Sequence, residues 1–481
     1  MRPVETLLLL ANLATFAMLA IPQLRSLRWP LYLALFALLV AVAQVLTEGP
    51  RWQMVPAYAL TGLFFLVWLL RNARQANGAV KRNRANRLAA GITIGLCILA
   101  LAFSALLPLA FPIFRFPHPS GPYEIGTLTY HWVDAARPEI FTADPNDHRE
   151  LMVQIWYPAK GGQDLKRAPY VQDGATLAPL ARLLRLPGFV LGHLKYVKTN
   201  AIPNAPVADG AAKYPVLIFL HGRGGYRQHN TFQVEELVSH GYIVAAVDQS
   251  YAAAAVAFPD GRVTALDTRM LDRRFEDSTI PYLSRDVSFT LDQLGSLNRK
   301  DKNGILTGRF DLQHVGVFGL SLGGEVAAEA CRFDPRLRAC LIMDVWMPAD
   351  VIKAGLRQPT MWISRDAATM RLEGWSRANT DETQSTMRKV FEELPADGYL
   401  VLIPGMFHED FSDAPLMSPL TSWLGITGPI DPERGHRIVN AYSLAFFDRY
   451  LKRQPAALLD GPAKQYPEVF FESRRTYAHR R

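Results

Sequence analysis

The pattern of apolar and polar positions changes near residue 115. Before that point, four long apolar stretches carry almost no charged residue inside them: 6–24, 31–47, 54–70 and 88–114. A helix needs about 20 apolar residues to cross a bilayer, and these stretches approach that length, although the second and third are short. Buried helices of a soluble domain would carry more charge. The pattern therefore predicts a four-helix transmembrane region over 1–114, followed by a proline-rich linker at 115–122.

Beyond the linker, apolar runs alternate with helical patterns. Two alternating segments, 128–132 and 151–156, predict a pair of antiparallel strands near a sheet edge. Six apolar runs are typical of buried strands: 216–220, 243–247, 315–318, 339–343, 360–364 and 400–403. Helical patterns lie between or after them: 230–240, 285–297, 322–331, 382–394 and 437–451. We therefore predict an α/β domain over 123–455, with a mostly parallel sheet covered on both faces, and a loose basic tail over 456–481.

The segment 164–213 interrupts this alternation as a helical insertion. Large apolar residues concentrate within 177–194, with Arg182 and Arg185 among them and Pro187-Gly188 as a break. A lid over an active site, an interfacial helix lying on lipid, and ordinary packing of an insertion all fit this pattern. The sequence leaves these three alternatives open.

The net charge of +8 comes largely from the segments between the apolar stretches. Basic residues without acidic neighbours fill two of these segments: Arg25, Arg28, Arg71, Arg74, Lys81, Arg82, Arg84 and Arg87. The opposite face of a four-helix bundle would offer only Arg2 and Arg51. By the positive-inside rule, the basic loops are cytoplasmic and both termini are extracytoplasmic. The charge thus predicts a multi-pass protein of the cell membrane, with its α/β domain outside, and not a nucleic-acid partner.

The three cysteines provide no disulfide framework. Cys97 lies in the fourth apolar stretch. Cys331 and Cys340 could pair on an oxidising face, but their places in a helical pattern and a strand favour two buried thiols.

The segment Gly319-Leu320-Ser321-Leu322-Gly323 follows an apolar run and precedes a helical pattern. A serine on so tight a turn needs glycines two residues to either side, because larger side chains would collide there. The N-terminus of the following helix adds free N–H groups and partial positive charge. A glycine-rich turn that contains a serine by chance is the alternative. The strand and helix on either side favour a nucleophile elbow with Ser321 as the nucleophile.

A nucleophilic serine requires a base and an acid that orients the base. In α/β-hydrolases these follow in the order serine, acid, histidine, on loops that leave strands. The next two predicted strands lead to Asp344 and Asp366, and the last strand leads to His408. His436 also follows both acids, but it begins a helical pattern. The pattern therefore predicts Ser321 and His408, with the acid open between Asp344 and Asp366.

Two backbone donors must bind the oxyanion that forms on the substrate. The N–H group of Leu322, directly after the nucleophile, is one candidate. The other lies in the loop after 216–220, which runs His221-Gly222-Arg223-Gly224-Gly225 and places Arg223 at the donor position. We expect His221 to be a structural histidine of this loop.

Several short segments together resemble the platelet-activating factor acetylhydrolase family of α/β-hydrolases over about 121–455. They are 121–123, 149–158, 214–222, 239–247, the turn at Ser321, Asp344-Val345-Trp346-Met347, and 405–411. The resemblance places the acid at Asp344 and the base at His408. The sequence departs from the family at Leu320, where members usually carry histidine, which implies an altered pocket shape with catalysis retained.

The sequence predicts a membrane-anchored serine carboxylic-ester hydrolase that forms an acyl-enzyme. The resemblance implies that it removes short acyl groups from phospholipids, and other small esters would fit the same residues. The apolar stretches predict the lipid bilayer as a further partner. No metal or organic cofactor is implied. A polyester or cutinase-like esterase is one alternative. A non-catalytic hydrolase fold that binds a lipid or a partner is another, although the complete set of Ser321, Asp344 and His408 disfavours it.

Overall fold

The computed structural model describes every residue except 22, 24–29, 77–86, 163–164 and 476–481. Within it the chain divides into two units. The first contains Met1–Phe114 and Met417–Leu420, and the second contains Arg115–Leu416 and Thr421–Arg481.

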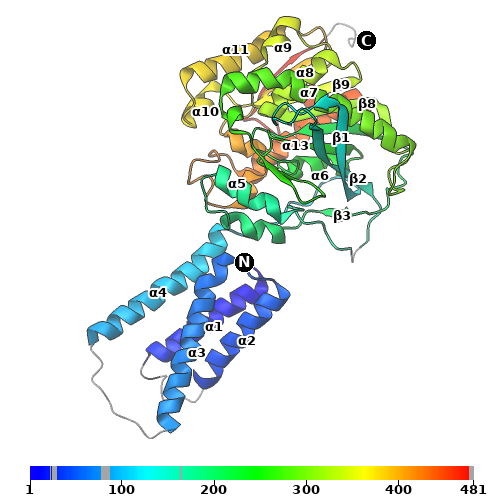
Figure 1. Ribbon diagram of the computed structural model, residues 1–481. Coiled ribbons are helices and arrows are strands. Elements are labelled where there is room, and N and C mark those ends of the chain that lie inside the picture. The colour runs from blue at the N-terminus through cyan, green and yellow to red at the C-terminus, as the bar shows by residue number, and fades with distance from the viewer. Residues whose placement is uncertain (22, 24–29, 77–86, 163–164, 476–481) are drawn as a thin grey trace. The chain divides into compact units, whose positions relative to one another are not determined.

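The first unit consists of helices that form from the four apolar stretches (Figure 1). They are α1 (Pro3–Ala20), α2 (Pro30–Thr47), α3 (Val55–Ala76) and α4 (Arg87–Ala110), with a 3-10 turn, η2, at Trp52–Met54. By length and composition, three described segments could cross a membrane: Pro3–Ala20, Trp52–Leu70 and Gly91–Ala110. The described apolar segment of α2, Tyr32–Thr47, is shorter. The helices thus form as expected, whereas four membrane crossings remain a prediction.

Charged groups hold the ends of these helices together. Glu5 accepts hydrogen bonds from Nε and Nη2 of Arg51, both at 2.7 Å, and also from Arg2. Nη1 of Arg51 donates to the carbonyl oxygen of Phe111 at 2.8 Å. The beginnings of α1 and α3 and the end of α4 therefore meet at one end of the unit. The basic residues Arg25, Arg28, Lys81, Arg82 and Arg84 of the predicted cytoplasmic loops lie outside the described residues.

The second unit is built on a mixed sheet of ten strands in the order β12-β11-β10-β9-β8-β4-β5-β2-β1-β3. The six strands from β5 to β11 are parallel to one another. The remaining strands form antiparallel pairs, apart from β3, which runs parallel to β1. The strands are β1 (Glu124–Pro138), β2 (His148–Ala159), β3 (Ala201–Pro203), β4 (Tyr214–Leu220), β5 (Ile243–Gln249), β8 (Phe310–Leu320), β9 (Leu337–Met343), β10 (Thr360–Ser364), β11 (Gly398–Leu402) and β12 (Phe470–Arg474). The predicted mostly parallel sheet is confirmed, and so is the antiparallel pair β1 and β2.

Helices cover both faces of this sheet, and each face has its own apolar core. One core contains buried side chains of α7, α8 and α11, and the other contains those of α6 and α13. The helices are α6 (Thr231–Ser239), α7 (Arg273–Arg299), α8 (Leu322–Phe333), α9 (Ala349–Ala354), α10 (Ala367–Leu372), α11 (Arg377–Glu393), α12 (Ala414–Met417) and α13 (Pro432–Leu451). Helix α7 begins well before the predicted residue 285, because Asp272 caps it by accepting hydrogen bonds from the N–H groups of Arg274 and Phe275.

The insertion forms helix α5 (Leu177–Leu183) and the 3-10 helix η4 (Val190–Tyr196), separated at the predicted Pro187-Gly188 break. A small hairpin, β6 (Ala255–Ala257) with β7 (Val263–Ala265), was not expected from the sequence.

The segment after 455 differs from the predicted loose tail. Strand β12 pairs antiparallel with β11 and so becomes the edge strand of the sheet. Leu459, Tyr466 and Val469 are buried in the core on the α13 side. These apolar residues are too widely spaced to give a periodic signal, which is why the sequence suggested no structure here. The final residues 476–481 lie outside the described part of the chain.

The cysteines are free thiols, and all three are buried. Cys331 lies in α8 and Cys340 in β9. Burial raises the pKa of the Cys331 thiol well above its usual value. Two buried thiols agree with the interpretation that the sequence favours.

A buried ion network joins β2 to α7. Nη2 of Arg149 lies 2.7 Å from Oδ2 of Asp286, and Nη1 lies 3.1 Å from Oε2 of Glu139. The Arg149 side chain is fully buried and also donates to the carbonyl oxygen of Ser250 at 2.9 Å. Asp286 is also bound by Arg137, whose Nη2 lies 2.6 Å from Oδ1. Removal of Arg149 would therefore leave the buried Glu139 without its ion-pair partner and Asp286 with one arginine in place of two.

We expect Arg149→Met to lower the free energy of unfolding by about 3–5 kcal/mol, because the buried carboxylate of Glu139 would lose its cation. Arg262→Met is the matched control, since Arg262 pairs with Asp260 and Glu150 but is 55% exposed. Its loss should cost less than about 1 kcal/mol. Denaturant unfolding of the full chain in detergent, followed by circular dichroism, measures both values. Equal losses for the two variants would contradict this account.

Candidate active site

The turn at Ser321 has the shape that the glycine pattern predicts. Strand β8 ends at Leu320, Ser321 has φ 55° and ψ −129°, and α8 begins at Leu322. A Cβ on Gly319 would lie 2.1 Å from the carbonyl oxygen of Gly323, and one on Gly323 would lie 2.1 Å from that of Leu220. A left-handed φ on serine is unfavourable and needs support from the surrounding structure. The turn therefore holds Ser321 in a strained conformation at the end of the sheet.

Asp344 and His408 are in direct contact. Asp344 follows β9, His408 begins the 3-10 turn η6 (His408–Phe411), and Asp344 Oδ2 lies 2.6 Å from His408 Nδ1. The Asp344 side chain is fully buried. Burial alone would raise the pKa of Asp344, but the Arg365 guanidinium and the contact with His408 hold that pKa below its usual range. A buried carboxylate thus faces Nδ1, which favours the tautomer that carries its proton there and leaves Nε2 as an acceptor.

Ser321 Oγ and His408 Nε2 do not form a hydrogen bond in the described structure. Ser321 is partly exposed, and the His408 side chain is 22% exposed. In enzymes, contacts of this kind often form only in the complex with substrate.

The two alternative residues have other partners. The Asp366 carboxylate caps α10, where it accepts hydrogen bonds from the N–H groups of Ala368 at 2.8 Å and Thr369 at 3.0 Å. His436 is buried within α13 and stacks on Phe232, with the ring centroids 3.7 Å apart. Burial lowers the pKa of His436 to about 4, and its Nε2 lies 2.9 Å from the carbonyl oxygen of Ser412. Neither side chain takes part in the Asp344–His408 contact.

The loop after β4 lies directly against Ser321. A Cβ on Gly222 would lie 3.2 Å from Ser321 Cβ and 3.8 Å from Ser321 Oγ. The buried His221 is held within this loop, with Nδ1 2.8 Å from the carbonyl oxygen of Gly222. Its Nε2 accepts a hydrogen bond from the N–H of Gln249 at 3.2 Å. A side chain at position 222 would therefore press tightly against Ser321.

The two predicted oxyanion donors directly follow Gly222 and Ser321 in the chain. The Arg223 guanidinium binds Glu276 near the start of α7, and the backbone N–H of Arg223 has no backbone acceptor among the described residues. Leu322 is the first residue of α8, and the first N–H groups of a helix have no acceptor inside it. Both groups are therefore available to a ligand.

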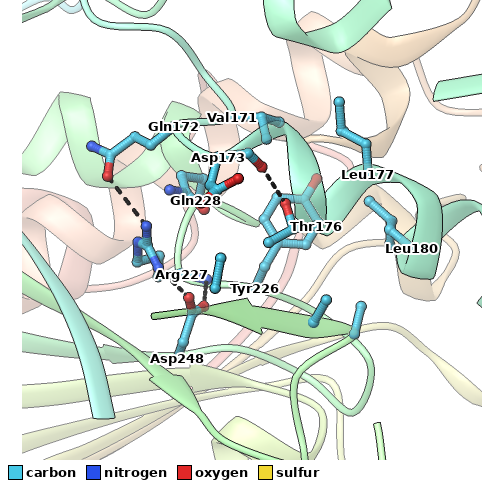
Figure 2. Close-up of a pocket in the computed structure, with 13 residues that line it drawn as sticks. Val171, Gln172, Asp173, Thr176, Leu177, Leu180, Tyr226, Arg227, Gln228 and Asp248 are labelled. Carbon is cyan, nitrogen blue, oxygen red and sulfur yellow. Dashed lines mark hydrogen bonds and ion pairs between the residues drawn. The ribbon is translucent and has the colours of Figure 1, made fainter. Parts of the chain in front are cut away.

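Helix α5 packs against the same loop. Gly224 has φ +70°, and a Cβ there would lie 2.6 Å from Leu183 Cδ2. Figure 2 shows Leu177 and Leu180 of α5 on one side of a small pocket and the Arg227–Asp248 ion pair on another. Arg227 also donates from Nη2 to Oε1 of Gln172 at 3.2 Å. This side of α5 thus packs on the loop beside Ser321, which fits both a lid and ordinary packing of the insertion, while Leu184 is exposed.

Three polar residues near Asp344 were missed by sequence reasoning: Ser364, Arg365 and Glu373. Ser364 Oγ donates to Asp344 Oδ1 at 2.9 Å, and Arg365 Nε does so at 3.2 Å. The carboxylate of Glu373 binds Arg365 and also accepts the N–H of His408 at 3.1 Å. In the sequence, the only indication of these contacts is Arg365, a charged residue directly after the apolar strand β10. The described residues include no cluster of three or more His, Cys, Asp or Glu side chains that could hold a metal ion.

Comparisons with known proteins match most of this chain. The family described as "Platelet-activating factor acetylhydrolase, isoform II" matches residues 110–273 and 295–457. Platelet-activating factor acetylhydrolase of Cavia porcellus is 26% identical over 378 residues, which cover 72% of this chain and 80% of that protein. A probable 1-alkyl-2-acetylglycerophosphocholine esterase of Arthroderma benhamiae is 23% identical over 411 residues, 79% of this chain and 98% of that protein.

A solved structure is similar as well. Ferulic acid esterase from Streptomyces cinnamoneus superposes with a TM-score of 0.61 at 30% sequence identity. The match covers 75% of this chain and 99% of that one. Together with the sheet order, it is consistent with the predicted α/β-hydrolase fold.

We expect Gly323→Ala to displace the turn and to lower esterase kcat/KM by about 100-fold or more, because a shift of about 1 Å at a reacting group has that effect. Gly461→Ala is the matched control, since its Cβ would meet nothing within 4 Å. The assay is hydrolysis of p-nitrophenyl acetate by the full chain in detergent. Full activity of the Gly323 variant would contradict the steric account of the turn.

Proposed function

Because the chain belongs to the platelet-activating factor acetylhydrolase isoform II family of esterase-type hydrolases, we propose that it hydrolyses carboxylic esters through an acyl-enzyme on Ser321. The observation that carries this proposal is the 2.6 Å contact between Asp344 and His408. It lies at the same end of the sheet as the strained turn that presents Ser321.

In this mechanism Ser321 Oγ attacks the acyl carbon while His408 Nε2 accepts its proton. Asp344 holds the proton on Nδ1 and stabilises the imidazolium that forms. The N–H groups of Leu322 and Arg223 bind the oxyanion. His408 then protonates the leaving alcohol as the carbon–oxygen bond breaks, which leaves the acyl group on Ser321. Water, deprotonated by His408, attacks the acyl carbon and releases the acid and the free serine.

The names of the relatives favour a short acyl group as the part that is removed. Those of Cavia porcellus and Arthroderma benhamiae are named for acetyl esters of glycerophosphocholines, whereas the structural relative is a ferulic acid esterase. We propose short-chain esters of phospholipids or of small alcohols as the substrate class. The second candidate, a polyester or cutinase-like activity, would use the same residues.

We further propose that the chain is anchored in the cell membrane, with the second unit on the extracytoplasmic side. Three apolar helices long enough to cross a bilayer support this, as does the start of the second unit directly after α4. Arg2 and Arg51 both bind Glu5, so the beginnings of α1 and α3 carry little uncompensated positive charge. The uncompensated basic residues of the sequence lie in the two predicted cytoplasmic loops.

Apolar side chains on the second unit make the bilayer a suitable source of substrate. Leu184 is 56% exposed, Phe189 59% and Trp423 83%. Burial of two or three such side chains in lipid would contribute about 3 kcal/mol or more. The membrane anchor already keeps the second unit near the bilayer. These side chains would instead help a substrate to pass from the lipid to Ser321.

We expect Ser321→Ala and His408→Ala each to lower kcat for ester hydrolysis by about 10⁴-fold or more, because triad residues act as one unit. Asp344→Asn should be nearly as damaging, since Asn offers an N–H group to Nδ1 and favours the wrong tautomer. Turnover of p-nitrophenyl acetate and covalent labelling by an organophosphonate are the measurements. An unlabelled wild-type protein without turnover would favour the non-catalytic alternative.

Asp366→Asn is the matched control for the acid. Asn is also a good helix cap, so this variant should retain the stability of α10 and most of the activity. A greater loss with Asp366→Asn than with Asp344→Asn would overturn the assignment of the acid.

We expect a cysteine at position 78 to resist membrane-impermeant thiol reagents in intact cells, because the predicted cytoplasmic loop contains that position. A cysteine that replaces the exposed Asp260 should react readily. The three native cysteines are buried, which keeps the background low. The reverse labelling pattern would place the second unit in the cytoplasm.

A further inference from the structure

Asp344, Arg365, Glu373 and His408 form a closed ring of contacts. Arg365 Nε donates to Asp344 Oδ1 at 3.2 Å, and its Nη1 binds Glu373 Oε2. Glu373 Oε1 accepts the backbone N–H of His408 at 3.1 Å, and His408 Nδ1 returns to Asp344 Oδ2 at 2.6 Å. The four residues come from four different segments, after β9, β10, α10 and β11. The ring therefore connects the acid side chain to the backbone of the histidine loop.

The arginine in this ring is completely buried. Its side chain is 0% exposed, and its guanidinium carbon lies 4.6 Å from the ring centroid of Trp375. The Trp375 ring in turn lies 5.9 Å from the His408 ring. Nη2 of Arg365 is buried without a partner in the described structure. Apolar residues of similar volume are often at least as stable as a buried ion pair, so stability alone gives little reason for an arginine here.

Asp344, Arg365 and Glu373 together carry one net negative charge. Asp344 and Arg365 by themselves would be neutral and would stabilise a protonated His408 only weakly. Glu373 adds one negative charge, so the set has the same net charge as an isolated aspartate. Arg365 can therefore hold the Asp344 carboxylate in place and ionised without removing the negative charge that the imidazolium needs.

We propose that Arg365 and Glu373 are a positioning pair for the triad, which locks Asp344 to the histidine loop and keeps the charge around His408 balanced. The inference rests on the proposed role of His408 as the general base. Neither residue touches the substrate. Both act through Asp344 and His408.

Other charged groups also surround His408. Glu409 and Asp410 lie on its own loop, and His229 lies across from it, with Nε2 3.7 Å from Glu409 Oε2. Burial lowers the pKa of His229 to about 4, so it is neutral in the range of interest. Burial raises the pKa of Asp410 to about 6, and this carboxyl is present in every variant. These groups are unchanged in the variants below, so differences between variants report on the pair at 365 and 373.

The test is the pH dependence of kcat/KM for p-nitrophenyl acetate, measured on the full chain in detergent. The acidic limb of this profile reports the pKa of the base in the free enzyme. Glu373→Gln removes a negative charge near His408, which disfavours the imidazolium. We expect its limb to move to lower pH by about one unit. Arg365→Met removes a positive charge, and its limb should move to higher pH by about the same amount.

The double variant Arg365→Met with Glu373→Gln restores the net charge and should return the limb close to that of the wild type, with a lower kcat because the ring is broken. Arg388→Met, which breaks an exposed pair with Glu472, is the control and should leave the profile unchanged. If Arg365→Met does not fold, Arg365→Lys takes its place, with an unshifted limb and a reduced kcat as the expected result.

Shifts in the same direction for Glu373→Gln and Arg365→Met would overturn the proposal. So would a reduced kcat and Tm with no shift of the limb in Glu373→Gln, the variant that changes the charge in either design. NMR titration of the His408 imidazole in the same variants should show the same opposite shifts. If the wild type neither turns over the ester nor reacts with an organophosphonate, the proposed function fails, whereas the titration still decides the charge balance.

Discussion

The hydrogen bond between Asp344 and His408 joins two residues that are 64 positions apart in the chain. It exists only because β9 and β11 each lie parallel to β10, so that the loops after these strands end at one edge of the sheet. Ser321 reaches the same edge from β8, the other neighbour of β9. Parallel pairing in the order β8-β9-β10-β11 thus brings the loops that carry Ser321, Asp344 and His408 to the same edge of the sheet. The candidate site depends on this order of parallel strands more than on any single side chain.

Steric limits decide the shape of the site at the serine. The turn holds Ser321 at a positive φ, Gly319 and Gly323 leave no room for a side chain, and Gly222 packs tightly against the serine. Such strain persists only on a rigid support. Strands β4, β8 and β9 supply it, since their residues near the turn are almost fully buried between the two apolar cores. The same close packing brings the loop backbone at Gly222 against Ser321.

Electrostatics decides the environment of the acid. A fully buried carboxylate would normally take up a proton, and a neutral Asp344 could not stabilise an imidazolium. The hydrogen bonds from Ser364, Arg365 and His408 keep it charged. Glu373 then compensates the buried arginine and holds the backbone of His408. The position of His408 and the ionisation of Asp344 thus depend on the same small set of contacts.

Local sequence patterns were enough to determine the apolar helices, the order of strands and helices, and the turn that carries Ser321. Each of these follows from the spacing of apolar residues or from glycines within a few positions. Local spacing alone left the acid open between Asp344 and Asp366, and the family resemblance favoured the first. The tertiary structure shows Asp366 as the cap of α10, a role that any aspartate before a helix can take. It also supplied Arg365 and Glu373, the early start of α7 and the edge strand β12. These features depend on contacts between segments that are distant in the chain. The pattern within one segment does not show which other segment will pack against it.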